Sequence, residues 1–249
     1  MTSEYPFDLG TYSRPISTKN STAKTWFDRG LIWTYSFNHE EAASCFAKAI
    51  AADELCPMAY WGLAYCLGPN YNKPWGFFDD KDLADVVRRG HGAATLALEN
   101  LAYTTPVEEA LVRAVQYRYP EWEPTGECEA WSKGFADAMG DVYRRFPDDF
   151  DVITVYADTM MNLNPWNLWD LKTGKPVDGA RTLEIKSILD RALTLDGALR
   201  HPGILHMYVH LMEMSPTPEA ALPAADHLRD LVPDGGHLQH MPSPLDVLC

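Results

Sequence analysis

Histidine is concentrated near the carboxyl end of this 249-residue chain, where six of the eight histidines lie between positions 201 and 240. The densest segment reads His201-Pro-Gly-Ile-Leu-His206-Met-Tyr-Val-His210-Leu-Met-Glu213. Its proline fits the first position of a helix. In such a helix His206, His210 and Glu213 share one stripe, because residues three or four apart are neighbours. Two imidazoles at this spacing can bind one metal ion, and the carboxylate can act as a further ligand or as a general base.

A second segment, Gly235-Gly-His237-Leu-Gln-His240, adds two histidines three residues apart. His237 and His240 follow His206 by 31 and 34 residues. In an array of helical repeats, corresponding helices of successive repeats lie side by side. The spacing therefore predicts that His206, His210, His237 and His240 converge as metal ligands, with Glu213 as the catalytic candidate. Imidazole ligands suit zinc, copper, iron or nickel, and the pattern does not choose among them.

Two other interpretations of the histidines stay open. Imidazoles ionise near neutral pH, so the cluster could transfer protons without a metal. It could also be a hydrogen-bonded ladder that holds the repeats in register, with His201 capping a turn. His39, His91 and His227 are interpreted as surface or turn residues without a role.

Aromatic and amide side chains gather in two irregular insertions, at positions 68–80 and 163–180. Tryptophan and asparagine together offer flat apolar surface and directional hydrogen bonds, which suit a small-molecule pocket. Both insertions follow a predicted helix, and we expect them to meet at one rim of the molecule. The candidate substrate-binding residues are Asn70, Asn72, Trp75, Asn164, Trp166, Trp169 and His201. The alternative is that these large side chains fill gaps between irregular repeats.

The elements that must position these residues are helices. Alanine and leucine are abundant and valine and isoleucine sparse over most of the chain, which favours helix over strand. Clusters of proline, glycine and aspartate separate the predicted segments. These segments are 26–33, 40–51, 57–67, 81–101, 107–118, 128–145, 149–162, 181–195, 202–213 and 218–231.

Small and large residues recur along the chain at a repeat spacing. Gly30, Ala42 and Phe46 match the tetratricopeptide (TPR) pattern, and the pattern restarts at Gly62, 32 residues after Gly30. A small residue on one helix lets the next helix approach closely. We therefore predict an all-α, TPR-like right-handed superhelix of helical hairpins, with residues 1–20 as an extended arm and residues 21–249 as a single domain.

Composition limits the classes of partner. The chain carries 21 Lys and Arg against 35 Asp and Glu, a formal charge of −14, which disfavours nucleic acids and anionic membranes. Its start lacks the features of a signal peptide, and no apolar stretch approaches the ~20 residues that span a bilayer. Five cysteines without a Cys-x-x-Cys pair suggest reduced thiols. We expect a cytoplasmic protein.

Several motifs resemble a family of large TPR-domain proteins of bacteria and filamentous fungi. They are the segments 59–72, 164–169, 201–210 and 236–243, so the resemblance covers most of the chain from about position 25 onward. It implies the superhelical fold and, through the fungal members, a part in small-molecule biosynthesis. The chain departs from the family at Pro244, where a histidine is usual, and relatives run to about twice this length.

These features support two hypotheses for function. The first is a metal-binding or acid–base protein that acts on a small organic molecule, as an enzyme of undefined reaction type, or binds it in its concave pocket. The second is a scaffold that binds a peptide or protein in the concave groove. Against carboxylate-terminated peptides, the predicted inner helices at 57–67, 150–161 and 202–213 contain no Lys or Arg. The apolar, uncapped carboxyl end also predicts self-association through that end.

Overall fold

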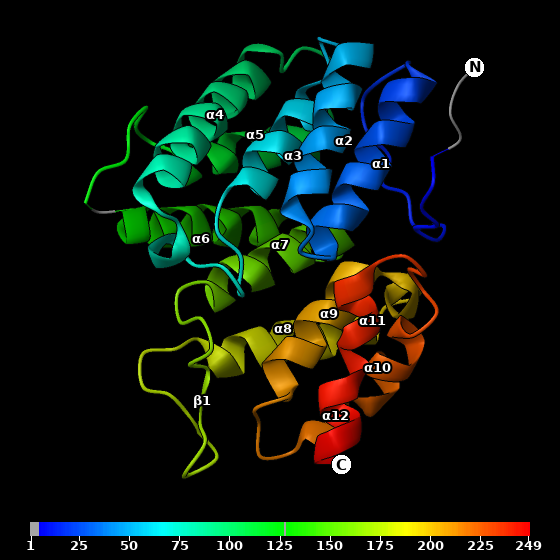
Figure 1. Cartoon of the computed structure of the whole chain (residues 1–249), viewed down its shortest axis with the longest axis vertical. Helices are drawn as coiled ribbons and strands as arrows, with labels where there is room; N and C mark the ends of the chain where they lie inside the picture. Colours follow the sequence, from blue (N-terminus) through cyan, green and yellow to red (C-terminus); the bar gives the residue numbers. More distant parts are fainter. Residues whose placement is uncertain (1–4, 127) are drawn as a thin grey trace.

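The computed structural model describes residues 5–126 and 128–249, and the regular secondary structure of these residues is almost entirely helical (Figure 1). Residues 5–20 form an extended arm ahead of the first helix. The α-helices are α1 (Ser21–Tyr35), α2 (His39–Ala52), α3 (Pro57–Leu67), α4 (Asp80–Glu99), α5 (Pro106–Val115), α6 (Cys128–Arg145), α7 (Phe150–Met161), α8 (Thr182–Leu193), α9 (Pro202–Met212), α10 (Leu222–Leu228), α11 (Gly236–His240) and α12 (Pro242–Leu248). Short 3₁₀ turns are η1 (Trp75–Phe77), η2 (Gln116–Arg118), η3 (Ala198–Arg200) and η4 (Pro218–Ala221).

Local sequence explains where the helices begin. Asn20 accepts hydrogen bonds from backbone amides of α1, and Asp149 does the same for α7, which satisfies amides that would otherwise lack partners. Thr105 and Glu108 form a reciprocal capping box at α5. His201 caps α9, where its ring nitrogen accepts from the Ile204 amide.

The small-to-large spacing seen in the sequence has a direct structural counterpart. The buried ring of Phe46, on α2, lies between Gly30 of α1 and Gly62 of α3. A Cβ atom at Gly30 or Gly62 would lie 2.8 Å or 2.2 Å from that ring. Both positions must therefore stay glycine for the three helices to pack this closely.

The helices form two groups that meet along α9. In Figure 1, α1 to α7 make up the upper part and α8 to α12 the lower part. α9 contacts α1, α7, α8 and α10, and every one of its residues from Pro202 to Met212 is buried. We expected the two histidine segments to lie side by side along the concave face, and the structure shows that the stripe carrying His206 and His210 is buried. The helix is covered on all sides, so the stripe is inside the protein.

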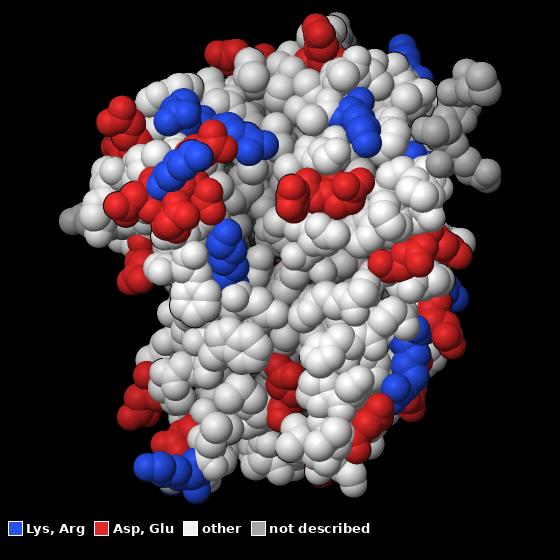
Figure 2. Space-filling model, viewed as in Figure 1, with Lys and Arg blue, Asp and Glu red and all other residues white. Residues whose placement is uncertain are grey.

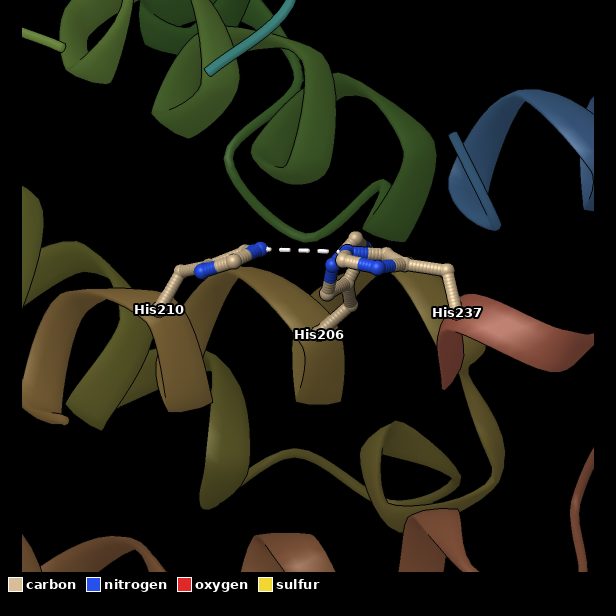
Figure 3. Close-up of side chains that lie close together, drawn as sticks. All are labelled: His206, His210 and His237. Atoms are coloured by element: carbon tan, nitrogen blue, oxygen red, sulfur yellow. Dashed lines mark hydrogen bonds between the residues drawn. The ribbon is translucent and has the colours of Figure 1, made fainter. Parts of the chain in front are cut away.

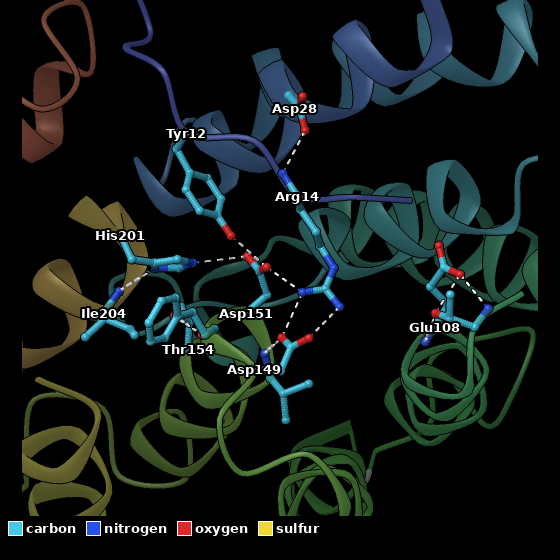
Figure 4. Close-up of polar contacts among 12 residues, drawn as sticks. Tyr12, Arg14, Asp28, Glu108, Asp149, Asp151, Thr154, His201 and Ile204 are labelled. Carbon is cyan, nitrogen blue, oxygen red and sulfur yellow. Dashed lines mark hydrogen bonds and ion pairs between the residues drawn. The ribbon is translucent and has the colours of Figure 1, made fainter. Parts of the chain in front are cut away.

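The amino-terminal arm is attached by buried polar contacts (Figure 4). Arg14 donates to Asp149 at 2.8 Å and to Asp151 at 2.5 Å, and its side chain is only 6% exposed. Tyr12 also donates to Asp151, at 2.7 Å. Farther along, the backbone amide of Ser17 donates to buried Glu108 at 2.6 Å.

Asp151 connects this arm to α9. Its carboxylate also accepts from the Tyr35 hydroxyl at 2.6 Å and lies 3.2 Å from His201 Nε2. Since His201 Nδ1 accepts from Ile204, its Nε2 carries the proton and donates to Asp151. Burial alone would raise the pKa of Asp151, but Arg14 and the hydrogen bonds from His201 and Tyr35 hold it well below its usual range. The arm, α1, α7 and α9 thus share one buried carboxylate.

The second insertion contains a short β-hairpin, with two residues in each strand, that the helical pattern did not predict. Strands β1 (Trp169–Asp170) and β2 (Lys175–Pro176) pair antiparallel. Trp169 is buried and its indole donates to the Leu211 carbonyl at 2.7 Å. This bond fixes the insertion to the end of α9, next to His210.

Two global features of the chain bear on its environment. Across the part of the chain that the structure describes, every helix is too short or too polar to cross a membrane. All five cysteines are free thiols, four of them buried, and Cys249 is exposed. On the last helix, α12, Val247 and Leu248 are exposed, and self-association through this end stays a prediction.

Candidate metal centre

Three histidines converge where α9 meets α11 (Figure 3). His206 and His210 come from α9, and His237 lies at the start of α11. One ring nitrogen from each lies within 4.8 Å of the other two. The Nε2 atoms of His210 and His237 are 3.3 Å apart. The predicted convergence of the two histidine segments is therefore confirmed for these three residues, and the group could hold a metal ion.

The distance between these two nitrogens fits a shared metal. Imidazole nitrogens bind zinc at about 2.0–2.1 Å in a tetrahedral arrangement, which separates neighbouring ligand atoms by roughly 3.3 Å. The 3.3 Å between His210 and His237 equals one such edge. A nitrogen of His206 lies within 4.8 Å of both, and an ion shared by all three would draw this imidazole closer. Three ligands would leave the fourth position for water or another ligand.

Hydrogen bonding sets which nitrogen His210 presents. Its Nδ1 lies 2.8 Å from the Glu213 carboxylate, which accepts the Nδ1 proton. The lone pair of Nε2 is then directed at His237, from whose Nε2 it accepts a hydrogen bond when no metal lies between them. A carboxylate behind a ligating imidazole is the usual arrangement in metal sites, since it fixes the tautomer and raises the basicity of the ligand. Glu213 therefore supports a ligand and does not approach the shared point itself.

His206 is the least explained side chain if no metal is present. It is 0% exposed, and within residues 5–126 and 128–249 neither of its ring nitrogens makes a hydrogen bond of normal geometry. The backbone of Tyr35 comes close enough to act against the lowering of its pKa but does not complete such a bond. Buried polar atoms are rarely left unpaired, because each costs the full free energy of its lost hydration. A bound metal would supply the missing partner.

Protonation is disfavoured at two members of the histidine triad, which consists of His206, His210 and His237. Burial, with smaller effects from His210 and His237, lowers the pKa of His206 well below its usual range. Burial and the neighbouring His210 and His240 lower the pKa of His237 to about 4. Neutral imidazoles keep the lone pairs that metals bind. The lowered pKa values make His206 and His237 poor proton carriers at neutral pH, which weakens the metal-free acid–base interpretation for these two residues.

Aromatic rings enclose the triad, and two of them occupy strained backbone positions. Phe37 is stacked on His210 and His237, with ring centroids 5.7 and 5.2 Å away, and its own φ is +52°. It stands directly after the end of α1, where glycine is usual. Trp166, with φ of +60°, stacks on Tyr71 and contacts the His210 ring. Strained residues of this kind concentrate at functional sites.

A cavity of about 830 Å³ reaches the triad from the protein surface. His237, Phe37 and the predicted residues Asn70 and Asn72 line it. The amide of Asn72 lies 3.5 Å from His237 Nε2. Figure 2 shows acidic side chains spread over this face of the molecule, around a recessed and largely uncharged region near its centre. The volume is within the range of small-molecule sites.

The other predicted binding residues have different neighbours. Trp75 is buried against Trp131 and donates to Ser132, and the backbone of Asn164 accepts from Asn167. Trp169 anchors the hairpin and His201 the arm, as described above. The two insertions do meet, through the 5.1 Å contact between Tyr71 and Trp166. Among the predicted substrate-binding residues, Asn70 and Asn72 line the cavity, and Trp166 contacts the triad.

His240 is also placed differently from the prediction. Its ring centroid is 6.2 Å from that of His237, and it is not part of the group whose nitrogens share one point. His240 is the last residue of α11 and is exposed, whereas His237, near the start of this helix, is half-buried. Residues three apart on a helix share a face, yet only the first of the two, His237, reaches across to α9 at this junction.

Sequence reasoning missed three residues of this region. His39 was given no role, but it lines the cavity and its Nε2 lies 3.2 Å from the Asn70 amide. Burial lowers the pKa of His39 to about 4. Phe37 and Tyr71 contact the triad. Phe37 follows a helix end without glycine, but no pattern in the chain marks that position as unusual.

A buried carboxylate lies close to the inner end of the cavity. Asp158, on α7, is 3% exposed and accepts from the Tyr65 hydroxyl at 2.7 Å. Its Oδ1 has no partner in the described part of the chain. Burial raises the pKa of Asp158 to about 6, against the lowering effect of Arg118. The folded protein therefore binds a proton here more readily than the unfolded chain does.

This predicts that Asp158→Asn stabilises the protein at high pH. Above pH 6 the wild type must keep a buried charge, which costs on the order of 2 kcal/mol. As the pH falls through 6 toward 4, the carboxyl becomes protonated in the folded state and that cost disappears. We expect the variant to have the higher free energy of unfolding at pH 8 and near equality at pH 4.5, measured by urea denaturation. A difference independent of pH would contradict the raised pKa.

The sequence matches no protein-family model and no curated protein. The function is therefore inferred from the geometry of the site.

Proposed function

We propose that the protein holds one divalent transition metal on His206, His210 and His237, and that it binds or transforms a small organic molecule beside that metal. The observation that carries the proposal is fully buried His206. Its ring nitrogens make no hydrogen bond of normal geometry in the described residues, and one of them lies within 4.8 Å of a nitrogen of His210 and of His237. Zinc, copper, iron and nickel all accept imidazole ligands. When bound, such a metal supplies Lewis-acid chemistry at its open position.

The residues around the centre have separate parts in this proposal. Glu213 orients His210, and Phe37 and Trp166 enclose the imidazoles. Asn72, beside His237, offers a hydrogen bond to a molecule that enters through the cavity. Glu213 then acts by positioning a ligand, which replaces the base role first considered.

Small molecules are favoured over a peptide as the ligand. The triad is buried, and the cavity that reaches it has the volume of a small-molecule site. A groove that binds an extended peptide or a helix would instead expose its recognition residues along its whole length. The peptide scaffold remains the alternative, and metal-independent peptide binding would support it.

The proposal also covers the fold, the family and the cellular location of the protein. We propose a TPR-like superhelix, supported by the Phe46 ring between Gly30 and Gly62 and by contacts between successive helices. Contacts between α1 and α9 bring distant parts together and close the concave side. Membership of the large TPR-domain family and a part in small-molecule biosynthesis are proposals on the motif resemblance. Free thiols in all five cysteines favour a cytoplasmic setting.

Metal analysis tests the centre directly. The protein purified without chelator or a histidine tag should carry, or take up from Zn²⁺ or Co²⁺ solution, one metal per chain. Anomalous diffraction should place that ion between His206, His210 and His237. Protein that takes up less than a tenth of an equivalent of every metal offered would refute the proposal.

Removing the carboxylate behind His210 should weaken the site without abolishing it. We expect Glu213→Gln to lower the affinity for Zn²⁺ by about 10- to 100-fold, because the amide no longer holds the Nδ1 proton as strongly. Competition with a chromogenic chelator would measure the change. Glu219→Gln, on the nearby 3₁₀ turn η4, is the matched control and should bind as the wild type does. Equal Zn²⁺ affinities of the wild type and both variants would contradict the role given to Glu213.

A further inference from the structure

The charge balance at the triad indicates which class of molecule would occupy the open position of a metal bound there. Three imidazoles are neutral as ligands, so a divalent ion would bring two positive charges into a buried site. In the described residues, Glu213 is the one carboxylate that is hydrogen-bonded to the triad, through His210. Buried charges are normally balanced by neighbours of opposite sign. One positive charge is left over, and an anion at the open position would neutralise it.

The cavity carries a second positive feature beside the triad. Lys73 lines it and follows Asn72 in a tight turn, in which Asn70 and Lys73 exchange backbone hydrogen bonds. Within the described ranges, Lys73 has no carboxylate at ion-pair distance, and its ammonium lies 4.1 Å above the Phe78 ring. Arg89, also in the lining, is already paired with Asp85 at 3.1 Å. Lys73 is thus the cation that remains available to a ligand.

Apolar and polar side chains share the wall of the cavity. Phe37, Phe78, Val86 and Leu67 line the cavity, which has room for a ring-sized body. Three acidic residues, Glu40, Asp82 and Asp85, also line it. They would repel negative charge placed away from the metal and Lys73.

We propose that the cavity binds a small organic anion with an apolar, ring-sized body. One carboxylate, phenolate or enolate oxygen of this molecule occupies the open metal position, and a second oxygen group interacts with Lys73. The inference rests on the proposed metal centre. It narrows the ligand to a chelating organic acid and excludes cationic and neutral molecules of the same size.

Protein loaded with Co²⁺ provides a readout that does not depend on activity, since the visible spectrum of Co²⁺ responds to its ligands. The probes are azide, salicylate and the uncharged analogue salicylamide. Salicylate should shift the Co²⁺ bands and bind at least tenfold more tightly than salicylamide. Lys73→Glu should weaken salicylate about tenfold, which corresponds to about 1.4 kcal/mol, and should leave metal loading unchanged. Lys172→Glu, an exposed lysine outside the cavity, is the control and should bind as the wild type does.

Each failure has a separate meaning. Absence of Co²⁺ uptake would refute the metal centre itself. Normal uptake with equal binding of salicylate and salicylamide, or equal effects of the two lysine variants, would refute the anion and leave the centre intact. Azide binding without salicylate binding would show an open metal position with no room for an organic body, and would also refute the proposed ligand class.

Discussion

Replacing His206 with leucine should abolish stoichiometric metal binding. One of three protein ligands is lost, and no nearby described side chain can replace it, because Glu213 is engaged with His210 and His240 lies outside the triad. With total binding free energies of about 10–16 kcal/mol for a four-ligand zinc site, each ligand accounts for roughly 3–4 kcal/mol, or 100- to 1000-fold in affinity. Metal content after dialysis and competition with a chelator would measure the loss.

The same substitution separates a metal centre from a structural ladder. In metal-free protein, His206→Leu removes two buried nitrogens that have no partner within the described ranges, so the free energy of unfolding should stay equal or rise by about 1 kcal/mol. A hydrogen-bonded ladder predicts the opposite sign. His240→Ala is the matched control for the metal measurement and should keep its metal. Loss of metal in His240→Ala alone would restore the fourth histidine and contradict the three-histidine site.

Asp151→Asn should destabilise the whole molecule. The carboxylate is 2% exposed and accepts hydrogen bonds from Arg14, Tyr12, Tyr35 and His201. An amide there leaves part of the buried Arg14 charge unbalanced and turns an acceptor into a donor. Breaking a buried pair in this way costs about 3–5 kcal/mol, which in a chain of this size lowers the melting temperature by roughly 10 °C. Thermal and urea denaturation would measure both quantities.

An adjacent acid provides the control for that experiment. Asp148 forms an exposed ion pair with Arg191, and exposed pairs contribute little, so Asp148→Asn should change the free energy of unfolding by less than about 1 kcal/mol. The effect of Asp151→Asn should also depend on pH. Because the folded state depresses the pKa of Asp151, its stabilisation is fully present above about pH 4 and is lost as the pH falls further. Equal effects of the two variants at pH 7 would contradict the role given to Asp151.

Much of the helical structure could be read from the sequence. The proline and glycine clusters mark most breaks, and the predicted segments 57–67 and 128–145 have the same bounds as α3 and α6. Local chemistry settles these boundaries, since helix caps involve residues only a few positions apart. The short elements were missed: the hairpin β1–β2 and the helices α11 and α12. Each is too brief to produce a clear periodic pattern.

For the candidate site, the sequence determined the ligand types and their pairing within α9. The i, i+4 spacing of His206 and His210 is a property of any helix, and the 31-residue separation correctly placed His237 beside them. The sequence could not determine that His237, and not His240, is the third member of the triad. A repeat spacing brings two segments together but does not show which histidine of the second segment points toward α9.

Only the tertiary structure decided the environment of these side chains. The contacts of α1, α7, α8 and α10 around α9 turn an apparent surface stripe into a buried one, and burial is what lowers the histidine pKa values and leaves His206 unpartnered. Phe37, Tyr71 and the arm residue Arg14 come from positions more than a hundred residues away from α9. Sequence spacing carries no information about such contacts, because they depend on how complete helices pack. The local sequence therefore determined the types and spacing of the histidines, and the packing of the helices determined that they are buried.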